Sequence, residues 1–102
     1  METKLKGIID HYGVASQQKK LAEEVFELQE AIREYQDFDE ANSVYEGDLY
    51  IMPKFRDDII EEMADVFVIL GQFVEHYKID TKEINDIMNF KINRQLERIN
   101  KE

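Results

Sequence analysis

The stretch Ile59-Ile60-Glu61-Glu62-Met63-Ala64-Asp65-Val66-Phe67-Val68-Ile69-Leu70 decides the fold of this chain. Its apolar residues, continued by Phe73, Val74 and Tyr77, occupy nearly every side of a helix, which is typical of a helix packed on several sides. Proline is tolerated in a first helical turn, so we expect this helix to run from about Pro53 to Lys78. Carboxylates inside such an apolar helix need a partner or a bound cation.

The rest of the chain also follows helical spacing, since only four glycines and one proline interrupt it. We expect a first helix over about 2–11 that ends at Gly13, and a second helix that begins after Ser16 as its N-cap. Asp80 is expected to cap a last helix. Residues 36–56 lose the periodicity and predict a long loop that can include a small hairpin over 43–51. The fold class is therefore all-α, as a four-helix-bundle-like domain.

At 102 residues the chain has the size of one small domain, which we expect to span 1–102. A domain this small buries a limited share of its surface, so association with further copies would add core. The fractions of hydrophobic (43%) and charged (35%) residues are those of a folded protein with amphipathic segments. We therefore expect a homo-oligomer, either a homodimer or a homotetramer.

The net charge of −10 narrows the possible partners. It opposes the positive contacts that a nucleic-acid backbone requires, so nucleic acid is not expected as a partner. A phosphate ligand would be repelled too, unless bound metal cations reverse the local charge. No long apolar run or secretion signal is seen, which predicts a cytoplasmic protein without a membrane partner. With no cysteine, thiolate metal sites and cysteine nucleophiles are excluded.

Two acidic pairs carry the candidate chemistry. Glu24 and Glu27 are three residues apart on the second expected helix, and Glu62 and Asp65 repeat that spacing on the third. Each pair lies on one face of its helix, one turn apart, so its oxygens can converge on one cation. A single pair of this kind is usually solvated surface, whereas two matching pairs beside or inside apolar positions favour a metal site. An all-oxygen site suits Mg²⁺, with Mn²⁺ as an alternative.

A carboxylate-bridged di-iron bundle is the competing metal site, and it requires Glu-x-x-His on two helices. His11 and His76 follow Ile8 and Phe73 at that spacing, so the sequence excludes this alternative.

The acidic motifs resemble a known family. The pattern E-E-x-x-E over 23–27, followed by E-x-x-D over 62–65, is similar to the MazG-type nucleoside triphosphate pyrophosphohydrolases, which are relatives of the dimeric dUTPases and the phosphoribosyl-ATP pyrophosphohydrolases. The similarity spans roughly Tyr12 to Arg98, and it includes Tyr12-Gly13 and Gln17 or Gln18 ahead of the first motif. The segment 28–61 between the motifs is longer than in compact members of the family.

The resemblance implies hydrolysis of a (d)NTP between its α- and β-phosphates, which gives the monophosphate and pyrophosphate in nucleotide-pool cleaning or control. It also implies that Glu24, Glu27, Glu62 and Asp65 are the Mg²⁺ ligands, and that neighbouring chains of a dimer or a dimer of dimers help to build each site. A metal ion would neutralise phosphate charge and acidify a bound water for in-line attack.

Further residues are candidates for supporting roles. Glu23 and Glu61 adjoin the metal pairs and are candidate general bases, with plain solvated surface as the alternative. Candidate phosphate contacts are Lys20, Lys91, Arg94 and Arg98. The last three share one face of the final helix, where they can equally complement its dipole. Candidate aromatic contacts to a base are Tyr12, Tyr45, Tyr50 and Phe55. The alternative function is a non-catalytic helical assembly module with an acidic face.

Overall fold

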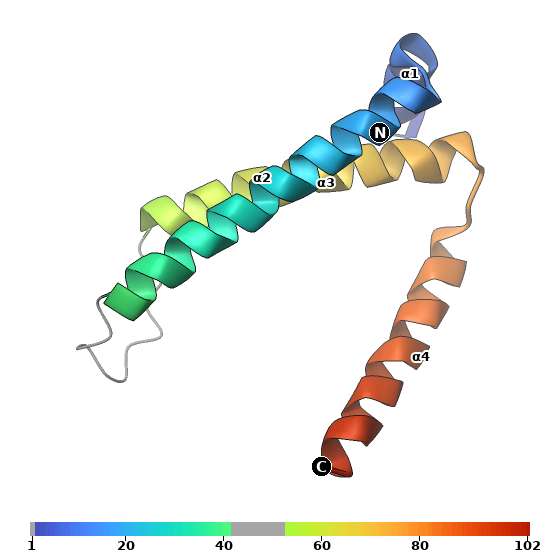
Figure 1. Cartoon of the computed structure of the whole chain (residues 1–102). Helices are drawn as coiled ribbons and strands as arrows, with labels where there is room; N and C mark the ends of the chain where they lie inside the picture. Colours follow the sequence, from blue (N-terminus) through green and yellow to red (C-terminus); the bar gives the residue numbers. More distant parts are fainter. Residues whose placement is uncertain (1, 42–52) are drawn as a thin grey trace.

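The computed structural model describes residues 2–41 and 53–102, and it is all-α (Figure 1). The four helices are α1 (Glu2–Tyr12), α2 (Val14–Ala41), α3 (Pro53–His76) and α4 (Thr81–Asn100). The described ranges contain no strand. The predicted all-α class and the bounds expected for α1 and α3 are therefore confirmed to within two residues. The predicted hairpin over 43–51 lies outside the described residues.

Gly13 alone separates α1 from α2. Its φ of +90° lies in the region that favours glycine, and its N–H donates to the Ile9 carbonyl oxygen at 2.8 Å. The carbonyl oxygen of Gly13 in turn accepts the first helical hydrogen bond of α2, from the Gln17 N–H at 3.1 Å. The expected N-cap at Ser16 is therefore wrong, because Gly13 ends one helix and begins the next, and Ser16 lies inside the first turn of α2.

The second helix also continues further than the sequence indicates, to Ala41 instead of ending near residue 36. Its last turns are held against α3 by aromatic contacts. The ring centroid of Phe55 lies 5.8 Å from that of Tyr35 and 5.0 Å from that of Phe38. Such pairs stabilise beyond their buried area, so tertiary packing extends the helix through a stretch of weak apolar periodicity.

The helices α2 and α3 run antiparallel and pack along their length, and α1 crosses the end of α3 (Figure 1). The buried apolar side chains among the residues that the structure describes are few, namely Ile9, Ala31, Val66 and Ile69. Leu5 of α1 lies over Gly71 of α3, where an added Cβ would approach the Leu5 Cδ1 atom to 2.9 Å. The absence of a side chain at Gly71 therefore lets α1 sit close to α3.

The chain leaves α3 through a short, hydrogen-bonded turn. Lys78 has φ of +53°, the Ile79 N–H donates to the Val74 carbonyl oxygen at 2.9 Å, and the Lys78 N–H donates to that of Glu75 at 3.3 Å. These are the two bonds of a Schellman motif, with lysine at the left-handed position where glycine is usual. Asp80 then caps α4, as predicted, because its side chain accepts from the Lys82 N–H at 2.9 Å.

The last helix stands away from the other three and buries none of its side chains (Figure 1). The radius of gyration is 17.6 Å, whereas a compact chain of this length has one of about 13 Å. No helix among the described residues is long and apolar enough to cross a membrane. One copy of the chain therefore presents a three-helix body and a projecting, amphipathic α4.

Candidate functional site

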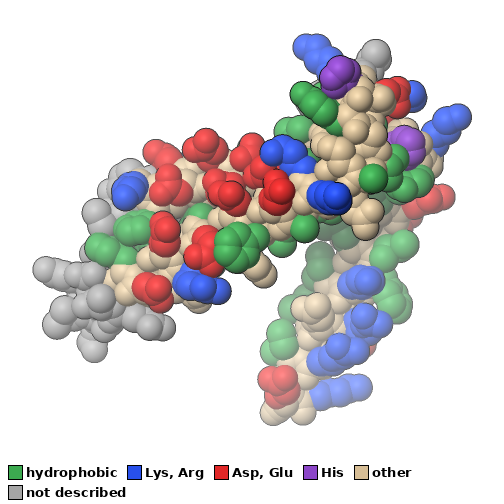
Figure 2. Space-filling view, turned by 45° about the horizontal axis from the view of Figure 1, so that its top comes forward, with side chains coloured by type: hydrophobic (Ala, Val, Ile, Leu, Met, Phe, Trp, Pro, Cys, Tyr) green, Lys and Arg blue, Asp and Glu red, His purple; other side chains and the backbone are tan. Residues whose placement is uncertain are grey.

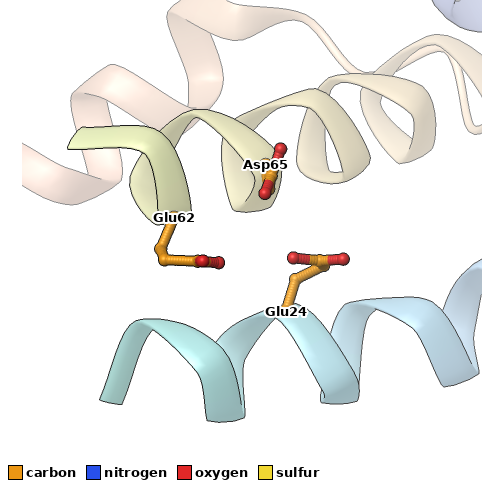
Figure 3. Close-up of side chains that lie close together, drawn as sticks. All are labelled: Glu24, Glu62 and Asp65. Atoms are coloured by element: carbon orange, nitrogen blue, oxygen red, sulfur yellow. The ribbon is translucent and has the colours of Figure 1, made fainter. Parts of the chain in front are cut away.

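Three carboxylates meet between α2 and α3. Glu24 extends from α2, Glu62 and Asp65 extend from α3, and one oxygen of each lies within 4.8 Å of the others (Figure 3). Glu62 and Asp65 share a face because they are one turn apart, and the antiparallel packing places Glu24 opposite them. Among the described residues, these three are the only acidic or histidine side chains that converge in this way. The arrangement offers all-oxygen ligands to a hard divalent cation.

Glu62 has a buried carboxylate oxygen and a raised pKa. Its Oε2 atom is buried and has no hydrogen-bond partner in the described structure. Loss of solvation raises the pKa of Glu62, and the negative charges of Glu27, Asp65 and Glu24 raise it further. A buried oxygen without a donor is rare in folded proteins, and an ion that completes the site would give this one a partner.

Lys20 lies one turn before Glu24 on α2 and pairs with it. Its Nζ atom is 3.2 Å from the Glu24 Oε1 atom, and the Lys20 side chain is 54% exposed. The hydrogen bond and charge of Glu24, with smaller contributions from Glu23 and Asp65, raise the pKa of Lys20. One ammonium does not offset three carboxylates, so the site keeps an excess of negative charge.

The other predicted acids lie around this group. Glu27 is exposed and does not join the three converging oxygens, although its charge is the strongest of those that raise the pKa of Glu62. Glu23 and Glu61 are also exposed and outside the group. Glu23 borders a shallow surface hollow that it shares with Lys20.

The predicted cations of the last helix lie apart from the acidic group of Glu24, Glu62 and Asp65 in their own chain. Lys91, Arg94 and Arg98 are exposed on α4, which does not pack against α2. On the face shown in Figure 2, acidic side chains gather over α2 and α3, while Lys and Arg side chains follow α4. One copy of the chain therefore does not bring these cations to the acidic group.

A pocket of about 470 Å³ begins at the acidic group and extends toward α1. Its volume is within the range of about 300–1,000 Å³ that is usual for small-molecule sites. Glu24 and Asp65 line it where it meets the acidic group, and apolar side chains of α1 and α3 contribute to its wall, whereas α2 contributes polar side chains. The complete lining is Ile8, Tyr12, Ser16, Gln17, Lys20, Glu24, Asp65, Val68, Ile69 and Gln72. The pocket thus joins a charged group to a largely apolar cavity.

Two buried amides are among the polar side chains of that wall. The Gln17 Nε2 atom donates to the Gln72 Oε1 atom at 2.8 Å, and the two residues are 4% and 2% exposed. The sequence motif included Gln17 without a role for it, and Gln72 was missed. The available signal was its position, because Gln72 interrupts an apolar helix seven residues after Asp65, as Gln17 precedes Glu24 by seven.

Comparison with known families agrees with this geometry. The profile of the MazG nucleotide pyrophosphohydrolase domain matches residues 13–99, which include both acidic pairs, both pocket glutamines and most of α4. No significant match was found among curated proteins or among solved structures. The matched region covers most of the chain and contains the converging carboxylates, and the chain therefore belongs to the MazG nucleotide pyrophosphohydrolase domain family.

Proposed function

We propose that this protein hydrolyses (d)NTPs between the α- and β-phosphates in a Mg²⁺-dependent reaction, which yields the (d)NMP and pyrophosphate. The observation that carries the proposal is the convergence of Glu24, Glu62 and Asp65, with one Glu62 oxygen buried and unpartnered. Family membership supports the nucleotide pyrophosphohydrolase class. The role would be the cleaning or control of the cytoplasmic nucleotide pool.

The donor set fits Mg²⁺. Three carboxylates provide hard oxygen ligands. Glu27, whose negative charge helps to raise the pKa of Glu62, is the proposed fourth ligand. Mn²⁺ accepts the same ligands. A divalent cation would offset the loss of solvation and the negative charges that raise the pKa of Glu62, and it would give the buried Oε2 atom a partner. The acidic group therefore has ligand atoms that suit a divalent cation, and one of its oxygens lacks a partner that a bound cation would provide.

Mg²⁺ bound there supplies the positive charge that offsets the triphosphate and activates the attacking water. The chain's own residues hold and orient the reactants. The exposed Lys20 side chain beside Glu24 is the proposed contact to a phosphate oxygen. Glu23 and Glu61 adjoin the ligands on their helices and are the proposed acceptors of the water proton.

The pocket is the proposed place of the nucleoside. It opens from the acidic group, so a triphosphate bound at the carboxylates would direct its nucleoside into the cavity. Tyr12 lies in its wall with 61% of its surface exposed. Its ring contacts that of His11 with the centroids 4.7 Å apart, and it is the proposed stacking partner of a base. Of the four aromatic candidates from the sequence, Tyr12 alone lines this pocket among the residues that the structure describes.

We propose further that the protein acts as a homodimer or homotetramer. The exposed apolar residues of α4 are Ile87, Met88, Phe90, Ile92, Leu96 and Ile99. Four of them, Met88, Ile92, Leu96 and Ile99, share one face of the helix by their spacing and form its uncovered surface. Large apolar side chains are also exposed on the three-helix body, with Phe26 at 61% and Phe67 at 66%. Association of α4 with the acidic body of another copy would cover both surfaces and pair opposite charges. Lys91, Arg94 and Arg98 would then reach the phosphate site from a neighbouring chain.

Pyrophosphate release tests the function. Each common dNTP is incubated with the protein and Mg²⁺, and released pyrophosphate is measured. Glu24→Gln and Asp65→Asn are expected to abolish turnover while the circular dichroism spectrum stays helical. Glu30→Gln is the matched control, because Glu30 is a glutamate of α2 outside the acidic group. Full turnover in both site variants would contradict the assigned ligands, and no pyrophosphate from any nucleotide would contradict the reaction.

Sedimentation tests the assembly. A folded monomer at micromolar concentration would contradict a shared site, whereas we expect a dimer or tetramer that Leu96→Asp weakens, because it places a charge in the uncovered surface of α4.

A further inference from the structure

The two buried amides in the pocket wall have hydrogen-bonding capacity that their mutual bond does not use. A glutamine amide has two N–H donors and a carbonyl acceptor. The bond between Gln17 and Gln72 uses one donor and one acceptor, which leaves the Gln17 oxygen and the Gln72 nitrogen. Neither amide makes a second hydrogen bond among the described residues. The Gln17 oxygen and the Gln72 nitrogen are not completely enclosed by the protein, since Glu62 Oε2 is the buried atom without a partner in the described structure. Both residues line the pocket, so a molecule bound there would lie against the side chains that carry these groups.

Their position relative to the acidic group suits a nucleoside. Gln17 is seven residues before Glu24, and Gln72 is seven residues after Asp65, which is two helical turns or about 10 Å along each axis. Because α2 and α3 are antiparallel, both steps lead in the same direction, from the carboxylates to the amide pair. A nucleotide with its phosphates at the carboxylates would extend its base toward the amides.

The pair can present its two groups in either order. If both amides rotate by half a turn, the hydrogen bond between them is kept with its direction reversed. The pocket then meets the Gln17 nitrogen and the Gln72 oxygen in place of the opposite arrangement. The base edges that matter are related in the same way, since cytosine offers an amino donor beside a ring acceptor, and uracil offers a carbonyl acceptor beside a ring donor.

We propose that Gln17 and Gln72 together read the Watson–Crick edge of the base, and that their linked amides accept amino and keto bases alike. The inference rests on the proposed nucleotide site. The pair makes the pocket selective for a hydrogen-bonding heterocycle over a base-free polyphosphate, without selecting one base by donor and acceptor order. Shape and the apolar wall remain to discriminate by size.

Equilibrium binding of non-hydrolysable nucleotides tests this role. The probes are the α,β-imido analogues of dCTP and dUTP, which differ in the order of donor and acceptor, and inorganic tripolyphosphate as a probe without a base. All are titrated in Mg²⁺ by calorimetry. For the wild-type protein we expect the two nucleotide affinities to agree within about tenfold. A preference of roughly 100-fold or more for either one would overturn the claim that both orders are accepted.

The variant that tests the amides is the double substitution Gln17→Met with Gln72→Met. Replacing both partners leaves neither amide buried without a partner, so the fold is preserved. We expect both nucleotide affinities to fall by roughly tenfold, while tripolyphosphate binding is unchanged. Gln18→Met, at an exposed neighbouring position, is the control and should bind all three probes as the wild type does. Unchanged nucleotide affinity, or an equal loss for tripolyphosphate, would show that the amides only support the fold.

The outcome is separable from that of the proposed reaction. If the wild-type protein binds the analogues through the amides but releases no pyrophosphate, the proposed hydrolysis is refuted, whereas base recognition by Gln17 and Gln72 is supported. Wild-type turnover with no effect of the double variant on nucleotide binding or on kcat/KM would do the opposite.

Discussion

The hydrogen bond between Gln17 and Gln72 makes a quantitative prediction about folding. Gln17→Met alone leaves the Gln72 amide in a nearly buried position without its partner, and Gln72→Met does the same to Gln17. Leaving one buried partner unsatisfied costs about 1–3 kcal/mol. Because both amides border a pocket that water can enter, we expect the lower end, about 1 kcal/mol for each single variant. For a domain of this size, that corresponds to a fall of about 4–8 °C in Tm.

The double variant should behave differently from the sum of the two. It has no amide left to satisfy and replaces a polar pair with two apolar side chains of similar length, so its stability should lie within about 0.5 kcal/mol of the wild type. Thermal unfolding of all four proteins is followed by circular dichroism without Mg²⁺, at one protein concentration because assembly would shift Tm. A double variant that loses as much as both single variants together would refute the reasoning, since the two side chains would then act independently.

Three further predictions concern the acidic group and the turn after α3. Mg²⁺ at 100 times its Kd should stabilise the wild type by about 2.7 kcal/mol, and Glu62→Gln or Asp65→Asn should lose most of the resulting rise in Tm; an equal rise in all three proteins would place the ion elsewhere. Without metal, the raised pKa of Glu62 means that its protonated form favours the folded state, so this contribution is complete below the usual pKa of 4.5 and is lost as pH rises through the raised value. Tm measured against pH in a chelator should therefore fall more steeply toward neutral pH for the wild type than for Glu62→Gln, and superimposable profiles would contradict the cause given for the shift. Lys78→Gly should stabilise the chain by about 0.5–1 kcal/mol in urea unfolding, because glycine adopts the left-handed conformation without strain; a loss of stability would show that the lysine side chain makes a larger contribution.

The helices were predictable where a local signal marks an end. Gly13 has no side chain and adopts the positive φ that ends α1, and the Asp80 side chain caps the start of α4. Both residues act as expected. The prediction of Ser16 as an N-cap was wrong because α2 already begins after Gly13. The extension of α2 depended on contacts with Phe55, which is distant in the sequence. The position of α4 was not predictable from one chain, because an apolar stripe shows that a helix needs a partner and does not show which molecule provides it.

The candidate site was predictable in part for a similar reason. Spacing along a helix places Glu62 and Asp65 on one face, but only the pairing of α2 with α3 decides that Glu24 joins them while Glu27 stays outside the three converging oxygens. The pocket was not visible in the sequence, because its wall comes from three helices. Gln72 is informative only once its contact with Gln17, 55 residues away along the chain, is known.

The turn at Lys78 also determines where the far end of α4 lies. The helix α4 has 20 residues and is therefore about 30 Å long, and its direction is set by the few backbone hydrogen bonds of the turn. A rotation of about 10° there would move the far end of α4 by about 5 Å, which is one helical pitch. Arg98 near that end would move almost as far, while Asp80 at the near end would hardly move. Small changes in the backbone of one residue are thus amplified into a change of which neighbouring groups the cations of α4 can reach.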